Sequence, residues 1–117
     1  MNGSNYFAWS YAAQKFDESK SVLARHFGKN WERMTYAVMP LIILQDKDFP
    51  DADLYQRTKS ILAKATRHGP LDLHGKQYWG SIEHTMRRSR RATFEALANE
   101  ILLIDEEIRI RRGDPPM

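Results

Sequence analysis

The densest group of functional side chains in this chain is the run Arg87-Arg88-Ser89-Arg90-Arg91. On an α-helix, with 100° between successive residues, its arginines fall within an arc of about 160° that also contains His84. A guanidinium group is a rigid fork of N–H donors that matches phosphate oxygens, and binding phosphates releases counterions. The run therefore predicts a basic helix face that binds nucleic acid. A face for an acidic protein partner and a merely solvated face are the two alternatives.

Charge is unevenly distributed along the sequence. The net charge is +3 at pH 7, but the segment 57–91 contains nine basic and two acidic residues, a net charge of +7. The remaining residues carry nine basic and thirteen acidic side chains, a net charge of −4. Such asymmetry indicates a surface for a charged partner. Three other cations of this segment extend the predicted binding site: Lys64, Arg67 and Lys76.

Histidines are the only side chains here that ordinarily titrate near neutral pH, and one of them stands close to an arginine. Arg67 and His74, separated by six residues, resemble the Arg-x(4–6)-His element of helical HEPN-type ribonucleases. The resemblance, which covers these two residues, implies a histidine that assists attack by the ribose hydroxyl and an arginine that stabilises charge on the phosphate. The turn at Gly69-Pro70 favours a second interpretation, in which both are capping residues.

Other reaction chemistries find no support in the sequence. There is no cysteine, which removes disulfides, thiolate catalysis and cysteine-based zinc sites. No Ser-His-Asp arrangement or phosphate-cradling glycine loop is present. A cluster of aspartates lacks the glycine and terminal glutamate of a calcium loop, so its members are expected at a helix start: Asp46, Asp48, Asp51 and Asp53. We therefore expect no metal or cofactor, and a non-enzymatic protein is preferred over an enzyme, which the ribonuclease resemblance leaves open.

The location of the protein is predicted from two further patterns. No run of eighteen apolar residues occurs, so we expect no transmembrane helix and no membrane partner. The segment Met1–Asn5 lacks the basic residues and apolar core of a secretory signal. A cytoplasmic protein is the expectation.

Apolar spacing predicts an all-α fold of about four helices in a single domain over residues 1–117, with 1–4 and 113–117 as frayed tails. The first helix is capped by Ser4 or Asn5 and runs to about Phe27. Its buried stripe consists of Trp9, Ala13, Phe16, Leu23 and Phe27.

The second helix is capped by Asn30 and runs from Trp31 to about Gln45. Pro40 inside it predicts either a kink or a division into two short helices, because its ring removes a backbone hydrogen bond.

The third helix begins at Asp51 or Asp53 and stops at His68-Gly69-Pro70. Its inner face consists of Leu54, Thr58, Ile61, Leu62 and Ala65. A short loop over 71–75 should follow.

The last predicted helix is one continuous element from Tyr78 to Arg112, about 50 Å long at 1.5 Å per residue. Its residues recur at steps of three and four, with one gap filled by Ser89 and Arg90. The stripe consists of Trp79, Ile82, Met86, Thr93, Leu97, Ile101, Ile104 and Ile108.

A second apolar line lies roughly opposite this stripe. Ala96, Leu103 and Ile110 are seven residues apart, and Leu102 is nearby. An apolar line on the far side of a helix must be covered or left exposed. We therefore expect self-association near the C-terminus, with a central position of this helix in the fold as the alternative.

Together these patterns predict a small accessory or regulatory protein that works by binding. Its basic face would contact nucleic acid or an acidic protein, and its last helix would form a homo-oligomer. A helical ribonuclease using Arg67 and His74 and a structural subunit of a larger assembly are the alternatives.

Overall fold

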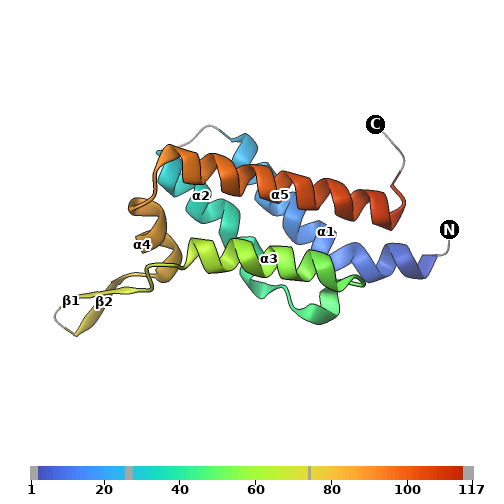
Figure 1. Ribbon diagram of the computed structural model, residues 1–117, viewed down its shortest axis with the longest axis horizontal. Helices are drawn as coiled ribbons and strands as arrows, with labels where there is room; N and C mark the ends of the chain where they lie inside the picture. Colours follow the sequence, from blue (N-terminus) through green and yellow to red (C-terminus); the bar gives the residue numbers. More distant parts are fainter. Residues whose placement is uncertain (1–2, 26–27, 74, 115–117) are drawn as a thin grey trace.

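The computed structural model describes residues 3–25, 28–73 and 75–114. Within these ranges the all-α fold with a long C-terminal helix is confirmed, and the elements are shown in Figure 1. They number five α-helices, two 3-10 helices and one hairpin: α1 (Gly3–Ala24), α2 (Asn30–Val38), η1 (Met39–Ile43), η2 (Asp46–Asp48), α3 (Ala52–Ala65), β1 (Leu71–Leu73), β2 (Lys76–Trp79), α4 (Ser81–Arg87) and α5 (Arg91–Arg112).

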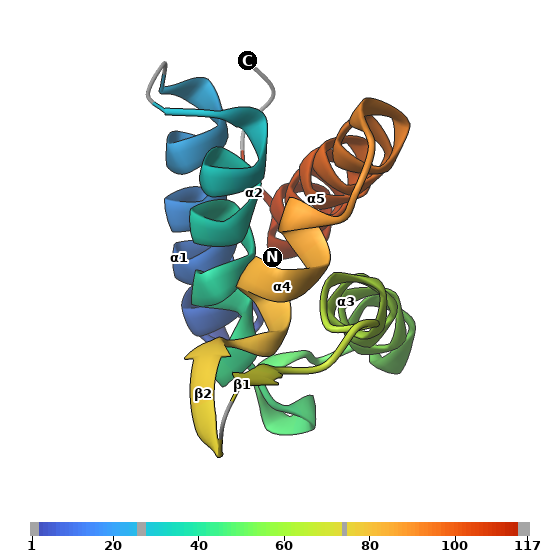
Figure 2. The same ribbon diagram turned by 90° about the vertical axis from the view of Figure 1, so that its left-hand side faces the viewer.

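The helices pack along one long axis of 55 Å. Helices α1 and α5 run antiparallel along it and form the most extensive helix contact (Figure 1). Seen from one end, α2 lies beside α1, α3 lies beside α5, and the short helix α4 stands between α2 and α3 (Figure 2). Helix α4 therefore connects the two halves of the bundle at that end.

The buried stripe of α5 forms the centre of the core. Its members follow the predicted helical spacing and are fully buried: Leu97, Ile101, Ile104 and Ile108. Trp9 and Phe16 of α1 and Leu54 of α3 belong to the same buried cluster. Burying one such side chain stabilises the fold by about 1.5–3 kcal/mol, so this stripe determines how α5 lies on its neighbours.

Ion pairs tie α5 to both neighbouring helices. Asp105, only 4% exposed, accepts from Lys20 of α1 at 3.1 Å and from Arg109 one turn later in α5. Arg111 donates to Asp51 and Asp53 at 3.0 and 2.7 Å. The two aspartates at the start of α3 therefore bind an arginine of this chain.

The prediction of a single helix from Tyr78 to Arg112 is wrong. Tyr78 lies in β2, α4 ends at Arg87, and Arg90 has an extended backbone with φ −97° and ψ 167°. The hydroxyl of Ser89 donates to the carbonyl of Thr85 at 2.7 Å, which competes with the next helical hydrogen bond. The break coincides with the gap in the apolar stripe, and it lets α4 pack on α2 while α5 packs on α1.

The region before α4 is a β-hairpin, where a loop and the start of the long helix were predicted. Strands β1 and β2 are antiparallel, with Leu71 opposite Trp79 and Leu73 opposite Lys76. Gly75 has a φ of +74°, which a residue without a Cβ adopts easily in so short a connection. The hairpin projects from the bundle beside α4 (Figure 1).

The other predicted boundaries hold within a few residues. Helix α1 begins at Gly3, one residue before the earlier of its two predicted caps, and Phe27 lies outside the described residues. The cap of α2 is Lys29, whose backbone N–H donates to Glu32 at 3.1 Å, rather than Asn30. At Pro40 the chain is divided in two, because α2 ends at Val38 and η1 continues from Met39.

Replacing Ile101 by Ala should lower the free energy of unfolding by about 2–5 kcal/mol, because a fully buried side chain leaves a cavity. Leu103→Ala on the same helix is the matched control, since Leu103 is 52% exposed. That variant should lose less than about 1 kcal/mol. Urea unfolding measures both changes, and equal losses would show that α5 does not bury the predicted face.

Candidate functional site at the α4 end of the bundle

Basic side chains from two separate parts of the chain meet at one end of the molecule. The C-terminal end of α3, helix α4 and the start of α5 gather there, next to the hairpin (Figure 1). The backbone N–H of His68 donates to Oγ1 of Thr85 at 3.0 Å, which holds the end of α3 against α4. Nδ1 of His84 lies 3.0 Å from the carbonyl oxygen of Gly69. A carbonyl only accepts, so this nitrogen carries the proton.

The two histidine rings face one another with centroids 5.7 Å apart. Desolvation lowers the pKa of His68 below its ordinary value of 6.5, and the positive charges of Arg88 and Arg67 and the neighbouring His84 lower it further. These contacts define what we name the basic end: Arg67, His68, His84 and Arg88. His68 was not among the residues predicted from the sequence to bind a partner.

The predicted run of arginines does not form a single helix face. Arg87 lies in α4, Arg88 caps its C-terminus, Arg90 caps the N-terminus of α5, and Arg91 is the first residue of α5. The expected arc of about 160° is therefore wrong, because it required an unbroken helix through Ser89.

Two of these arginines have partners within the chain. Arg87 donates to Glu83 at 3.0 Å, and its guanidinium lies 3.8 Å from the ring centroid of Trp31. Arg91 donates to Glu95 at 3.0 Å in an exposed pair. In the described part of the chain, Arg67, Arg88 and Arg90 form no ion pair with a carboxylate.

The remaining predicted cations surround this end. Lys64 is exposed in the last turn of α3. Lys76 lies in β2, and its side chain is outside the described residues. His74 also lies outside them, so the resemblance to a ribonuclease through Arg67 and His74 receives no support from the geometry.

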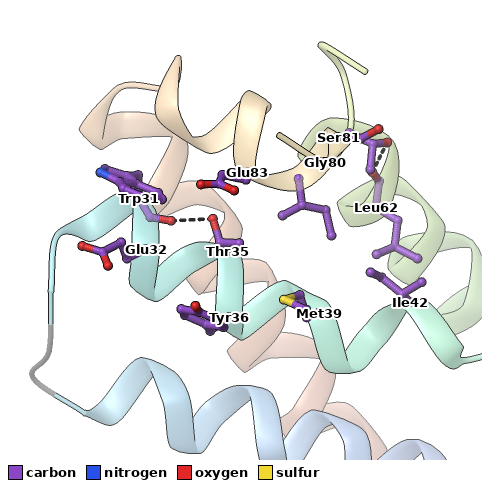
Figure 3. Close-up of a pocket in the computed structure, with 12 residues that line it drawn as sticks. Trp31, Glu32, Thr35, Tyr36, Met39, Ile42, Leu62, Gly80, Ser81 and Glu83 are labelled. Carbon is purple, nitrogen blue, oxygen red and sulfur yellow. Dashed lines mark hydrogen bonds between the residues drawn. The ribbon is translucent and has the colours of Figure 1, made fainter. Parts of the chain in front are cut away.

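An open groove of about 760 Å³ lies between α2, η1, the end of α3 and the start of α4 (Figure 3). Tyr36, Met39 and Ile42 line it and are 53, 49 and 54% exposed. This volume is in the range of ligand and peptide sites. The remaining lining residues are Trp31, Glu32, Thr35, Leu62, Thr66, Gly80, Ser81, Ile82 and Glu83.

Charge and apolar surface are separated along the groove. Trp31, Glu32 and Glu83 gather at one end, and Met39, Ile42 and Leu62 lie toward the other (Figure 3). Both lining side chains that carry a charge at neutral pH are carboxylates, Glu32 and Glu83. The groove is thus an acidic and apolar site on a chain of net positive charge.

The second apolar line of α5 is exposed in the single chain. Leu102, Leu103 and Ile110 are 43, 52 and 63% exposed, and Ala96 is exposed as well. The alternative, in which a central position of α5 in the fold buries this face, is therefore wrong. The face contacts either solvent or a second molecule.

Two further features are absent from the described residues. No group of three histidine, aspartate or glutamate side chains is placed there to hold a metal ion. No helix in that part of the chain is long and apolar enough to cross a membrane.

Comparisons of the chain with protein-family models, with curated proteins and with solved structures give no match.

Acidification should destabilise the fold through His68. Its pKa in the folded chain lies below the ordinary value of 6.5, so the unfolded chain binds the proton first as the pH falls. The contribution of neutral His68 to stability is fully present above the ordinary pKa of 6.5. It is lost as the pH falls through the lower pKa that His68 has in the folded chain. His68→Asn should remove this dependence.

Urea unfolding at about pH 8 and about pH 5.5 measures the effect. The difference in free energy of unfolding between wild type and His68→Asn should be smaller at the lower pH. An unchanged or larger difference would show that desolvation and the neighbouring positive charges do not lower the pKa of His68 in the folded chain.

Proposed function

We propose that this chain is a small, non-enzymatic accessory protein that binds nucleic acid through its basic end. The observation that carries the proposal is the meeting of Arg67, His68, His84 and Arg88 from two segments at one exposed end. Arg67 and Arg88 have no carboxylate partner among the described residues, so their charge remains available to an external anion.

Phosphates are the anions that this arrangement suits best. Guanidinium groups pair with phosphate oxygens through parallel N–H donors. The two imidazole rings, tilted by 50° to one another, add planar surfaces next to these donors, and a base can stack on such a surface. An acidic protein offers carboxylates but no planar bases. We therefore prefer nucleic acid to an acidic protein as the partner of the basic end.

Binding should be strongly dependent on salt. Four phosphate contacts, from Lys64, Arg67, Arg88 and Arg90, give a slope of about −2.8 for a single strand in a plot of log affinity against log salt. The affinity for single-stranded RNA should then fall by about fiftyfold between about 50 and 200 mM salt. Fluorescence anisotropy of a labelled oligonucleotide measures this.

The double variant Arg67→Ala/Arg88→Ala should weaken binding and make the slope shallower by about 1.4. The matched control is Lys15→Ala/Lys47→Ala, which removes the same charge from α1 and η2. Equal effects of the two double variants would indicate attraction by net charge alone. No binding of RNA or DNA at low salt would assign the basic end to an acidic protein.

We also propose that the chain self-associates through the exposed line of α5. Three large apolar side chains on one helix face form an exposed apolar patch, and its burial against another molecule is favourable: Leu102, Leu103 and Ile110. The neighbouring segment carries both acidic and basic residues over 105–112, which suits antiparallel pairing of two copies.

Leu103→Glu/Ile110→Glu should reduce the mass in light scattering to that of one chain, because two carboxylates would enter the shared surface. Ile43→Glu is the control, since Ile43 is 56% exposed in η1 and lies outside this line. A wild type that is already monomeric at high concentration would contradict the proposal.

A further inference from the structure

The groove beside α4 has the dimensions of a helix-binding site. Its lining residues on α2 and η1 recur from Trp31 through Thr35 and Met39 to Ile42, at steps of three and four. They cover one face of three helical turns, about 16 Å at 1.5 Å per residue. A helix of about three turns presents anchors to such a groove at steps of three, four and seven residues.

One end of the groove already holds a cation of the chain itself. Arg87 lies on the ring of Trp31 at 3.8 Å and donates to Glu83 at 3.0 Å. Glu32 brings a second carboxylate to the same end (Figure 3). Two carboxylates and one paired guanidinium leave this end with excess negative charge, which complements a further cation.

The other end offers apolar surface without charge. Met39 and Ile42 are about half exposed there, and Leu62 and Ile82 lie behind them, Ile82 being 8% exposed. A side chain that enters this end removes apolar area from water on both partners. The groove therefore prefers an occupant with a basic residue at one end and apolar residues along one face.

We propose that the groove binds a basic amphipathic helix of a partner protein, with a lysine or arginine near Glu32 and Glu83 and apolar anchors over Met39 and Ile42. Helix α4 belongs to both surfaces, since Ile82 and Glu83 line the groove while His84 and Arg88 belong to the basic end. The protein can thus hold a nucleic acid and a partner helix on opposite sides of one short helix. The groove proposal does not depend on nucleic-acid binding.

The test is a selection of helical peptides of about 14 residues, displayed at random composition, against the wild-type chain. Selected peptides should share a lysine or arginine one turn from two apolar residues spaced by three or four. Ile42→Glu should weaken the best peptide by about tenfold or more, because it places a charge in the apolar end.

Ile43→Glu is the matched control, because Ile43 is equally exposed in the same 3-10 helix and does not line the groove. Glu83→Lys should weaken a peptide with a basic residue and strengthen the same peptide with glutamate in its place.

Three results would overturn the proposal. The first is a set of selected peptides that share no basic position. The second is an equal loss of peptide affinity in Ile42→Glu and Ile43→Glu. The third is a mass in light scattering that is lower for Ile42→Glu than for the wild type while that of Ile43→Glu is unchanged. The last would make a second copy of this chain the occupant.

Discussion

The hydrogen bond from Ser89 to the carbonyl of Thr85 and the extended backbone of Arg90 end α4 and allow α5 to start in a new direction. Two apolar surfaces require this change. Ile82 and Met86 are buried in the part of the fold where α4 meets α2, and the stripe from Leu97 to Ile108 is buried along α1 and α3. One straight helix cannot face both, and burial of these side chains outweighs the few hydrogen bonds lost at the break.

Both candidate binding surfaces follow from that bend. Because α4 turns toward α2, its first residues close one side of the groove. Its last residues meet the end of α3, where His68 and His84 contact each other. Arg87 stands between the two surfaces, on Trp31 and Glu83. The two surfaces therefore share one short helix.

Much of the fold could be predicted from periodicity, and the places where this failed have physical causes. The buried faces of α3 and α5 follow the 3.6-residue period, because burial in a bundle is what creates that period. The gap at Ser89 and Arg90 was visible in the sequence and marked the break. Arginine and serine do not force a helix to end, so the direction of α4 depends on its tertiary contacts.

The candidate site was less predictable. The charge asymmetry predicted a binding segment that contains Arg67, His84 and Arg88 of the basic end, and the binding role of that segment stays a prediction. The pairing of His68 with His84 joins residues sixteen apart in sequence and depends on how α3 meets α4. Only one wall of the groove follows a helical spacing in the sequence, and the groove itself could not be predicted because its walls come from α2, η1, α3 and α4.

The most direct test of the account is an NMR titration of the ¹⁵N-labelled chain with a single-stranded RNA of about ten nucleotides. The account predicts that amide shifts concentrate at Arg67, His68, His84 and Arg88, while Met39 and Ile42 on the far side of α4 change little. Shifts centred on the groove, or no shifts at low salt, would contradict the assignment of the basic end to nucleic acid.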